Sequence, residues 1–210
     1  MNAEPRRETD YEDRQVRAAH RVLVDVGQVL ASFHDSIVVV GGWVPDLLIL
    51  SDEPKHIGSI EVDLALDAEK LNDGRYAELL KLLLGTARYQ KGVKPFQMVI
   101  SVELEDDEPP VVVELESLAS SEVKRQRNHP KLVDDFRVLQ FPACAAAFES
   151  PVDTEIKGQM ISGAENSVRL LVASLSDFII MKAHAIGGGA TNPRTCMTSA
   201  NVSTPTPVES

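Results

Sequence analysis

Two stretches of sequence decide the fold, Ile-Val-Val-Val-Gly-Gly at residues 37–42 and Ile-Glu-Val-Asp-Leu-Ala-Leu at residues 60–66. The first begins with an unbroken β-branched run, typical of a strand buried on both faces, and ends at a glycine pair. The second alternates, so Glu61, Asp63 and Ala65 share one strand face and the apolar residues share the other. We therefore expect two core strands, one ending at a glycine turn and one carrying two carboxylates that point the same way.

Helices are expected on both sides of the first strand. An apolar stripe with steps of three and four residues precedes it and predicts an amphipathic N-terminal helix. The stripe consists of Val16, Ala19, Leu23, Val26, Leu30 and Phe33. A short helix from Trp43 to Leu50 should follow the glycines, because Pro45 then sits in the first turn, where a missing N–H costs nothing. Trp43 is interpreted as a core anchor.

The rest of the chain predicts an α/β (or α+β) fold with a small mixed β-sheet flanked by helices. The later elements expected are a helix over 76–85, strands over 96–104 and 111–116, a short strand at 138–141, a strand over 168–172, and a helix capped by Ser174. The last helix should bury Phe178, Ile179, Met181 and Ala185. Three segments are expected: an N-terminal helix (1–36), a core domain (37–186) and a polar tail (187–210), predicted to be disordered.

Composition narrows the class of protein. The 210 residues carry a formal charge of −11, which argues against broad electrostatic adhesion to nucleic acid. One basic run, residues 124–131, is interpreted as a solvated turn. Only Cys144 and Cys196 are present, which fits a reducing cytosol. No apolar run approaches the roughly 20 residues of a membrane span, so we expect a cytoplasmic protein.

The acidic positions indicate a metal-dependent reaction. Carboxylates two residues apart on one strand face, here Glu61 and Asp63, can share two Mg²⁺ ions that clamp the attacking and leaving oxygens of a phosphoryl transfer. A third carboxylate should come from a neighbouring strand. Glu114 is preferred, and Glu116, of the same parity and about 7 Å further along, stays open. The alternative is that Glu61 and Asp63 form the solvent side of an edge strand.

The glycine pair suggests a place for phosphate. Glycine lets the backbone approach a triphosphate closely, and the N–H groups of the next helical turn, from Gly42 to Val44, favour an anion. An ordinary strand-to-helix turn would explain Gly41 and Gly42 equally well on their own. Only their combination with the acidic strand favours a nucleotide site.

These motifs together resemble the nucleotidyltransferase superfamily, and within it the AbiEii/AbiGii toxin-like nucleotidyltransferases. The resemblance rests on Val-Val-Gly-Gly-Trp-Val-Pro-Asp-Leu-Leu at 39–48, His-Ile-Gly-Ser-Ile-Glu-Val-Asp-Leu-Ala-Leu-Asp at 56–67, and Ser-Leu-Ser-Asp-Phe-Ile-Ile-Met-Lys-Ala-His-Ala at 174–185. It implies a DNA polymerase beta-like fold. It also implies transfer of a nucleoside monophosphate from an NTP to a hydroxyl on RNA, protein or a small molecule.

The resemblance also implies roles for individual residues. Gly41, Gly42 and Ser59 would contact the nucleotide phosphates, Glu61 and Asp63 the two Mg²⁺ ions, Glu114 the catalytic metal, and Lys182 the nucleotide or acceptor. Lys182 has an equally good alternative as part of a solvated helix face. An antitoxin protein is the partner that the resemblance implies.

Two departures from the family pattern support a second hypothesis. The first carboxylate of the family is usually Asp, and Glu61 is longer by one methylene, which can displace a metal. Relatives also continue past the 174–185 helix with Lys-x-x-Asp and further helices, so we expect a C-terminally truncated relative. The alternative function is therefore a degenerate, non-catalytic protein that binds a nucleotide or a partner.

Overall fold

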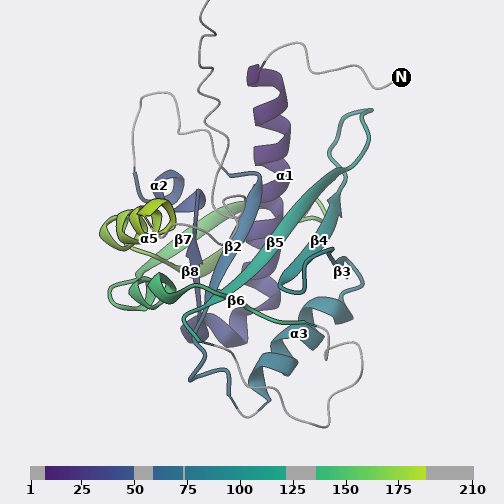
Figure 1. The fold of residues 1–210 in the computed structure, drawn as a ribbon. Coiled ribbons are helices and arrows are strands. Elements are labelled where there is room, and N and C mark those ends of the chain that lie inside the picture. Colours follow the sequence, from purple (N-terminus) through teal and green to yellow (C-terminus); the bar gives the residue numbers. More distant parts are fainter. Residues whose placement is uncertain (1–7, 50–58, 73, 122–135, 188–210) are drawn as a thin grey trace, which may run out of the picture.

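The computed structural model describes residues 8–49, 59–72, 74–121 and 136–187. They form a mixed α/β fold in which an eight-stranded mixed sheet packs against helices (Figure 1). The elements are α1 (Glu8–Val29), η1 (Ala31–Ser36), β1 (Ile37–Val40), α2 (Trp43–Leu48), β2 (Glu61–Leu66), α3 (Arg75–Gly85), β3 (Tyr89–Lys91), β4 (Gln97–Val102), β5 (Val111–Ala119), β6 (Leu139–Gln140), η2 (Pro142–Phe148), β7 (Val152–Gln159), β8 (Glu165–Val172) and α5 (Leu175–Gly187).

The strands follow the order β3-β4-β5-β2-β1-β8-β7, and β6 pairs with β5 off this path. β2 lies inside the sheet, antiparallel to β1 and parallel to β5. β1 is short and β-branched, and its four residues are all buried, as predicted for a strand covered on both faces. Because β2 has a strand on each side, the alternative that Glu61 and Asp63 lie on an edge strand is wrong.

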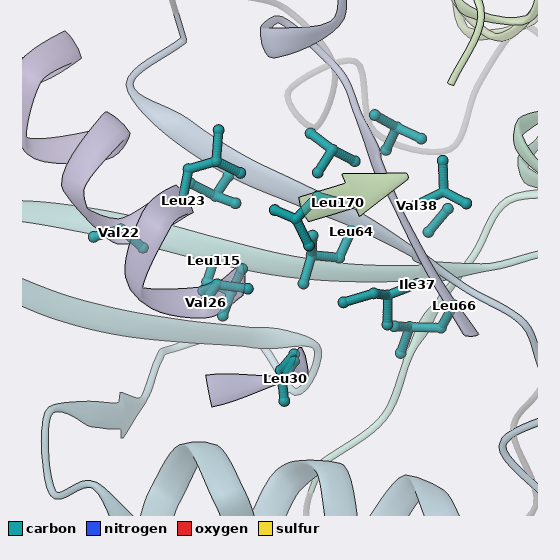
Figure 2. Packing of buried hydrophobic residues seen from close by; sticks show 14 of the residues in the cluster. Val22, Leu23, Val26, Leu30, Ile37, Val38, Leu64, Leu66, Leu115 and Leu170 are labelled. Atoms are coloured by element: carbon teal, nitrogen blue, oxygen red, sulfur yellow. The ribbon is translucent and has the colours of Figure 1, made fainter. Parts of the chain in front are cut away.

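Helix α1 lies at the centre of the core. It contacts β4 and β5 from one half of the sheet and β7 and β8 from the other. Figure 2 shows residues of α1 gathered with residues of the sheet. The labelled residues are Val22, Leu23 and Val26 from α1, Leu30 directly after it, Ile37 and Val38 from β1, Leu64 and Leu66 from β2, Leu115 from β5 and Leu170 from β8.

The burial of α1 is wider than the single stripe predicted from its sequence. Ala18 and Val24, which lie off that stripe, are as fully buried as Leu23 on it. Residues 21–27 are buried without a break, whereas Arg17 and Gln28 on either side of this stretch are exposed, so the middle of the helix is covered more widely than one stripe. α1 and the sheet therefore share one hydrophobic core.

A buried carboxylate fixes α1 to the segment before β3. Asp25 is fully buried, and both of its carboxylate oxygens accept hydrogen bonds from Arg88 Nη2 at 3.0 Å. Tyr89 donates its hydroxyl to Asp25 Oδ2 at 2.8 Å. Burial and the nearby Asp25 raise the pKa of Tyr89 well above its usual value, so the phenol stays protonated and keeps donating.

The sequence missed two strands and overestimated the buried face of the last helix. β3 is only three residues long, and β7 is an edge strand in which Ile156 is the one fully buried side chain, so neither has a clear alternation. In α5, Met181 is buried as predicted but Ile179 is 63% exposed. The prediction for Ile179 is wrong because α5 packs on η2 and α2 along one side only.

Other predictions are confirmed or cannot be placed. Ser174 caps α5 as expected: its Oγ accepts the backbone N–H of Asp177 at 3.2 Å and donates to the Asp177 carboxylate. No helix in the described ranges combines the length and apolar character that crossing a bilayer requires. The basic run at 124–131, Cys196 and the predicted tail beyond residue 187 lie outside the described residues.

Candidate acidic site beside the glycine turn

The pairing of β2 with β5 gathers four carboxylates on one side of the sheet. In the parallel register Glu61 lies opposite Glu114, and Asp63 lies opposite Glu116. Residues paired across neighbouring strands point to the same face. The two acidic pairs that the sequence predicted on separate strands are therefore one group, the acidic cluster, defined as these four residues.

The glycine turn after β1 lies directly against Asp63 of this cluster. Asp63 is paired with Val40, the last residue of β1. Gly41 follows with a φ of +73°, in the left-handed region, and a Cβ placed on it would lie 2.2 Å from Asp63 Oδ2. A Cβ on Gly42 would lie 2.9 Å from the Cβ of Ser59. Both glycines are thus required by a close approach, and Gly41 also by its backbone conformation.

Trp43 holds the start of β2 against the turn. Its indole is buried, with 1% exposed, and Nε1 donates a hydrogen bond to the backbone oxygen of Glu61 at 2.9 Å. The hydroxyl of Ser59, which is also buried, accepts the backbone N–H of Glu61 at 3.4 Å. Trp43 is a core anchor, as predicted, and its single polar atom positions the first acidic residue of β2.

Mutual repulsion and burial perturb the carboxylates on β2. Burial raises the pKa of Asp63 to about 8, and the charges of Glu61 and Glu116 add to this shift. Burial also raises the pKa of Glu61, followed by the charges of Glu116 and Glu114. Asp63 therefore keeps a proton at neutral pH unless a cation approaches it.

Three polar side chains from other elements surround the cluster. Lys94 Nζ donates to Glu116 Oε1 at 2.7 Å, and Gln97 Nε2 donates to Glu114 Oε2 and, at 3.4 Å, to Glu116 Oε1. The charge of Lys182, on α5, lowers the pKa values of both Glu61 and Asp63. Its ammonium is therefore close enough to act electrostatically on both β2 carboxylates. The acidic cluster thus has a lysine from each of two distant segments.

Sequence reasoning missed Lys94 and Gln97. The signal for them was indirect, because they stand at the start of the strand that pairs with β5, and Gln97 lies opposite Glu116 in that register. An antiparallel register cannot be read from the sequence without the turn that fixes it. The contacts of Lys94 and Gln97 with the carboxylates of β5 could therefore not be predicted from the sequence.

The residues of the cluster suit Mg²⁺ in their chemistry, since carboxylate oxygens are the ligands this ion prefers. Glu114 and Glu116 are held by Gln97 and Lys94. Within the described ranges, no three His, Cys, Asp or Glu side chains are gathered as a ready metal-ligand set. The donor type therefore suits a divalent cation, while the described positions of the carboxylates do not form a three-ligand set.

The predicted site residues come together from four parts of the chain. The group comprises Gly41, Gly42, Ser59, Glu61, Asp63, Glu114, Glu116 and Lys182. Between the two candidates for third carboxylate, Glu116 is the more buried and raises the pKa values of both Glu61 and Asp63. Glu114 stays a prediction, and the geometry adds Glu116 as an equal candidate.

Comparison with known proteins adds no family assignment. No protein-family model matches the chain, and no curated protein matches it either.

Proposed function

We propose that the protein is a nucleotidyltransferase that transfers a nucleoside monophosphate from an NTP to a hydroxyl group, in a DNA polymerase beta-like fold of the AbiEii/AbiGii type. The observation that carries this proposal is the contact between the glycine turn and Asp63, on a strand whose two carboxylates pair with two more on β5. A glycine turn suits phosphate, and paired carboxylates suit the cations that accompany it.

In the proposed reaction, the acceptor oxygen forms a bond to the α-phosphorus as the bond to pyrophosphate breaks. Glu61, Asp63 and either Glu114 or Glu116 would hold Mg²⁺, which when bound supplies positive charge to the attacking and leaving oxygens. Lys182 adds a positive charge close to the same carboxylates, where it can meet the triphosphate. Gly41 and Gly42 let the backbone of the turn lie directly against Asp63 and Ser59, so that its N–H groups can reach a phosphate held beside the carboxylates.

The test is label transfer from α-³²P-labelled NTPs in Mg²⁺, with RNA, protein and small-molecule acceptors supplied separately. Asp63→Asn should abolish transfer, because it removes a ligand charge and leaves the backbone register unchanged. Asp107→Asn, in the exposed hairpin between β4 and β5, is the matched control and should transfer normally. Transfer by Asp63→Asn at the wild-type rate would rule out the site.

A second function, binding of a nucleotide or an antitoxin-like partner without catalysis, has an observation in its favour. Glu114 and Glu116 are already engaged by Gln97 and Lys94, and no ready ligand set is present among the described side chains. Calorimetry with NTP and Mg²⁺ separates the two functions. Binding without label transfer would favour this second function.

A further inference from the structure

Lys94 enters the acidic cluster from the turn that precedes β4. Its side chain is 41% exposed, whereas the Glu116 side chain that it contacts is only 2% exposed. The ammonium therefore extends from the surface to a carboxylate that has almost no contact with solvent. A buried carboxylate next to two others needs such a cation, because burial and like charge both oppose its ionisation.

The oxygen that Lys94 contacts has no remaining place for a metal. Glu116 Oε1 accepts Lys94 Nζ at 2.7 Å and also Gln97 Nε2 at 3.4 Å. A carboxylate oxygen offers about two lone-pair directions, so both are in use. Gln97 also donates to Glu114, and the same two side chains thereby engage both β5 carboxylates.

We infer that Lys94 is a built-in counter-cation, whose ammonium neutralises Glu116 in the metal-free protein and is displaced when a divalent cation enters the acidic cluster. This inference rests on the proposed function, since it names what regulates cation entry at that site. The ammonium on Glu116 Oε1 repels a divalent cation that approaches the same carboxylate, and both lone-pair directions of that oxygen are already in use. Lys94 thus lowers the affinity of the cluster for metal.

The test is titration of the full chain with Mn²⁺ alone, followed by calorimetry and by electron paramagnetic resonance of free Mn²⁺. Lys94→Met should bind Mn²⁺ about tenfold or more tightly than the wild type, because a competing charge is removed. Lys94→Arg, which keeps the charge, should stay near the wild-type affinity. Equal or weaker binding by Lys94→Met would overturn the inference and point to Lys94 as a ligand of the nucleotide instead.

Lys157→Met is the matched control. It removes the same charge from β7, where Lys157 pairs with Glu155 at 3.1 Å and two strands separate it from β2. Its Mn²⁺ affinity should equal that of the wild type. If Lys157→Met tightened Mn²⁺ binding as much as Lys94→Met does, the effect would come from net charge alone, and the inference would be overturned.

A stability measurement covers the case in which Lys94→Met does not fold. In EDTA, Lys94→Met should melt at a lower temperature than the wild type, and the double variant Lys94→Met with Glu116→Gln should recover most of the loss. If Lys94→Met is unfolded, Lys94→Met with Glu114→Gln is compared with Glu114→Gln alone, and the former should still bind Mn²⁺ more tightly. No recovery in the first comparison, or no tightening in the second, would overturn the inference.

Failure of this inference can be told from failure of the proposed function. Label transfer by the wild type without tighter Mn²⁺ binding by Lys94→Met would remove the counter-cation role alone. Tighter binding by Lys94→Met without label transfer by the wild type would remove the catalytic function alone, and it would leave Lys94 as the cation that keeps the cluster closed to metal.

Discussion

Gly41 and Asp63 are in such close contact that a Cβ on the glycine would lie 2.2 Å from a carboxylate oxygen of the aspartate. The contact joins the end of β1 to the middle of β2. It fixes the turn against the acidic cluster, so the conformation of one depends on the position of the other.

Replacing Gly41 with alanine should therefore damage both stability and the site. The positive φ of +73° costs a residue with a Cβ about 1–2 kcal/mol, and the clash with Asp63 adds to this. We expect a loss of at least about 1 kcal/mol in urea unfolding, with weaker NTP binding.

Gly85→Ala provides the control, since a Cβ there would meet nothing within 4 Å. It ends α3, where alanine should be neutral or stabilising by up to about 1 kcal/mol. Equal effects from both substitutions would contradict the close contact at Gly41.

The raised pKa of Asp63 makes stability depend on pH. The folded protein holds this proton up to about pH 8, whereas the unfolded chain releases it near the model-peptide value of 3.8. Because the folded state then binds more protons, stability should fall as the pH rises from about 4 to about 8. Asp63→Asn should remove up to about 6 kcal/mol of this fall.

The measurement is a series of urea unfolding curves in EDTA between pH 4 and pH 9. The wild type should lose stability across this range more steeply than Asp63→Asn. Parallel curves for the two proteins would show that Asp63 titrates normally. Addition of Mg²⁺ should stabilise the wild type most at the alkaline end.

Trp43 is the single tryptophan of the chain and reports on the site without a label. Because its indole is buried and hydrogen-bonded to the backbone of Glu61, we expect blue-shifted emission that changes when NTP and Mg²⁺ bind. Trp43→Phe should cost about 1 kcal/mol for the lost hydrogen bond and more for lost packing. Emission typical of exposed indole in the folded protein would contradict this placement.

Asp25→Ala should be among the most damaging substitutions away from the site. It would leave Tyr89 and Arg88 without their buried partner, and breaking a buried charged pair costs about 3–5 kcal/mol. Asp106→Ala is the comparison, because Asp106 pairs with Arg14 at the surface and such pairs contribute less than about 1 kcal/mol. The loss of unfolding free energy measured in urea should be several-fold larger for Asp25→Ala than for Asp106→Ala.

The sequence predicted elements wherever the local pattern is strong. β1, α2 and β2 follow from the β-branched run, the glycine pair and the alternation at 60–66, and the structure confirms them with shifts of one or two residues. The same patterns predicted that Glu61 and Asp63 share a face.

What the sequence could not predict depends on contacts between distant segments. The pairing of Asp63 with Glu116 rather than with Glu114 is a matter of register, and a shift of one residue along a strand is invisible in composition. The burial of Ala18 and Val24, which lie off the predicted stripe, depends on strands from both halves of the sheet. The contact of Lys94 with Glu116 could be recognised only from the structure, in which β4 pairs with β5.

The central position of α1 also has a consequence for biosynthesis. The helix leaves the ribosome before β8, which covers part of it and is made about 140 residues later, roughly 10–30 s at usual translation rates. During that interval the apolar residues of α1 do not yet have β8 to pack against. Its contacts are among the most distant in the sequence, so we expect slow folding, and protection by a chaperone until β8 is complete.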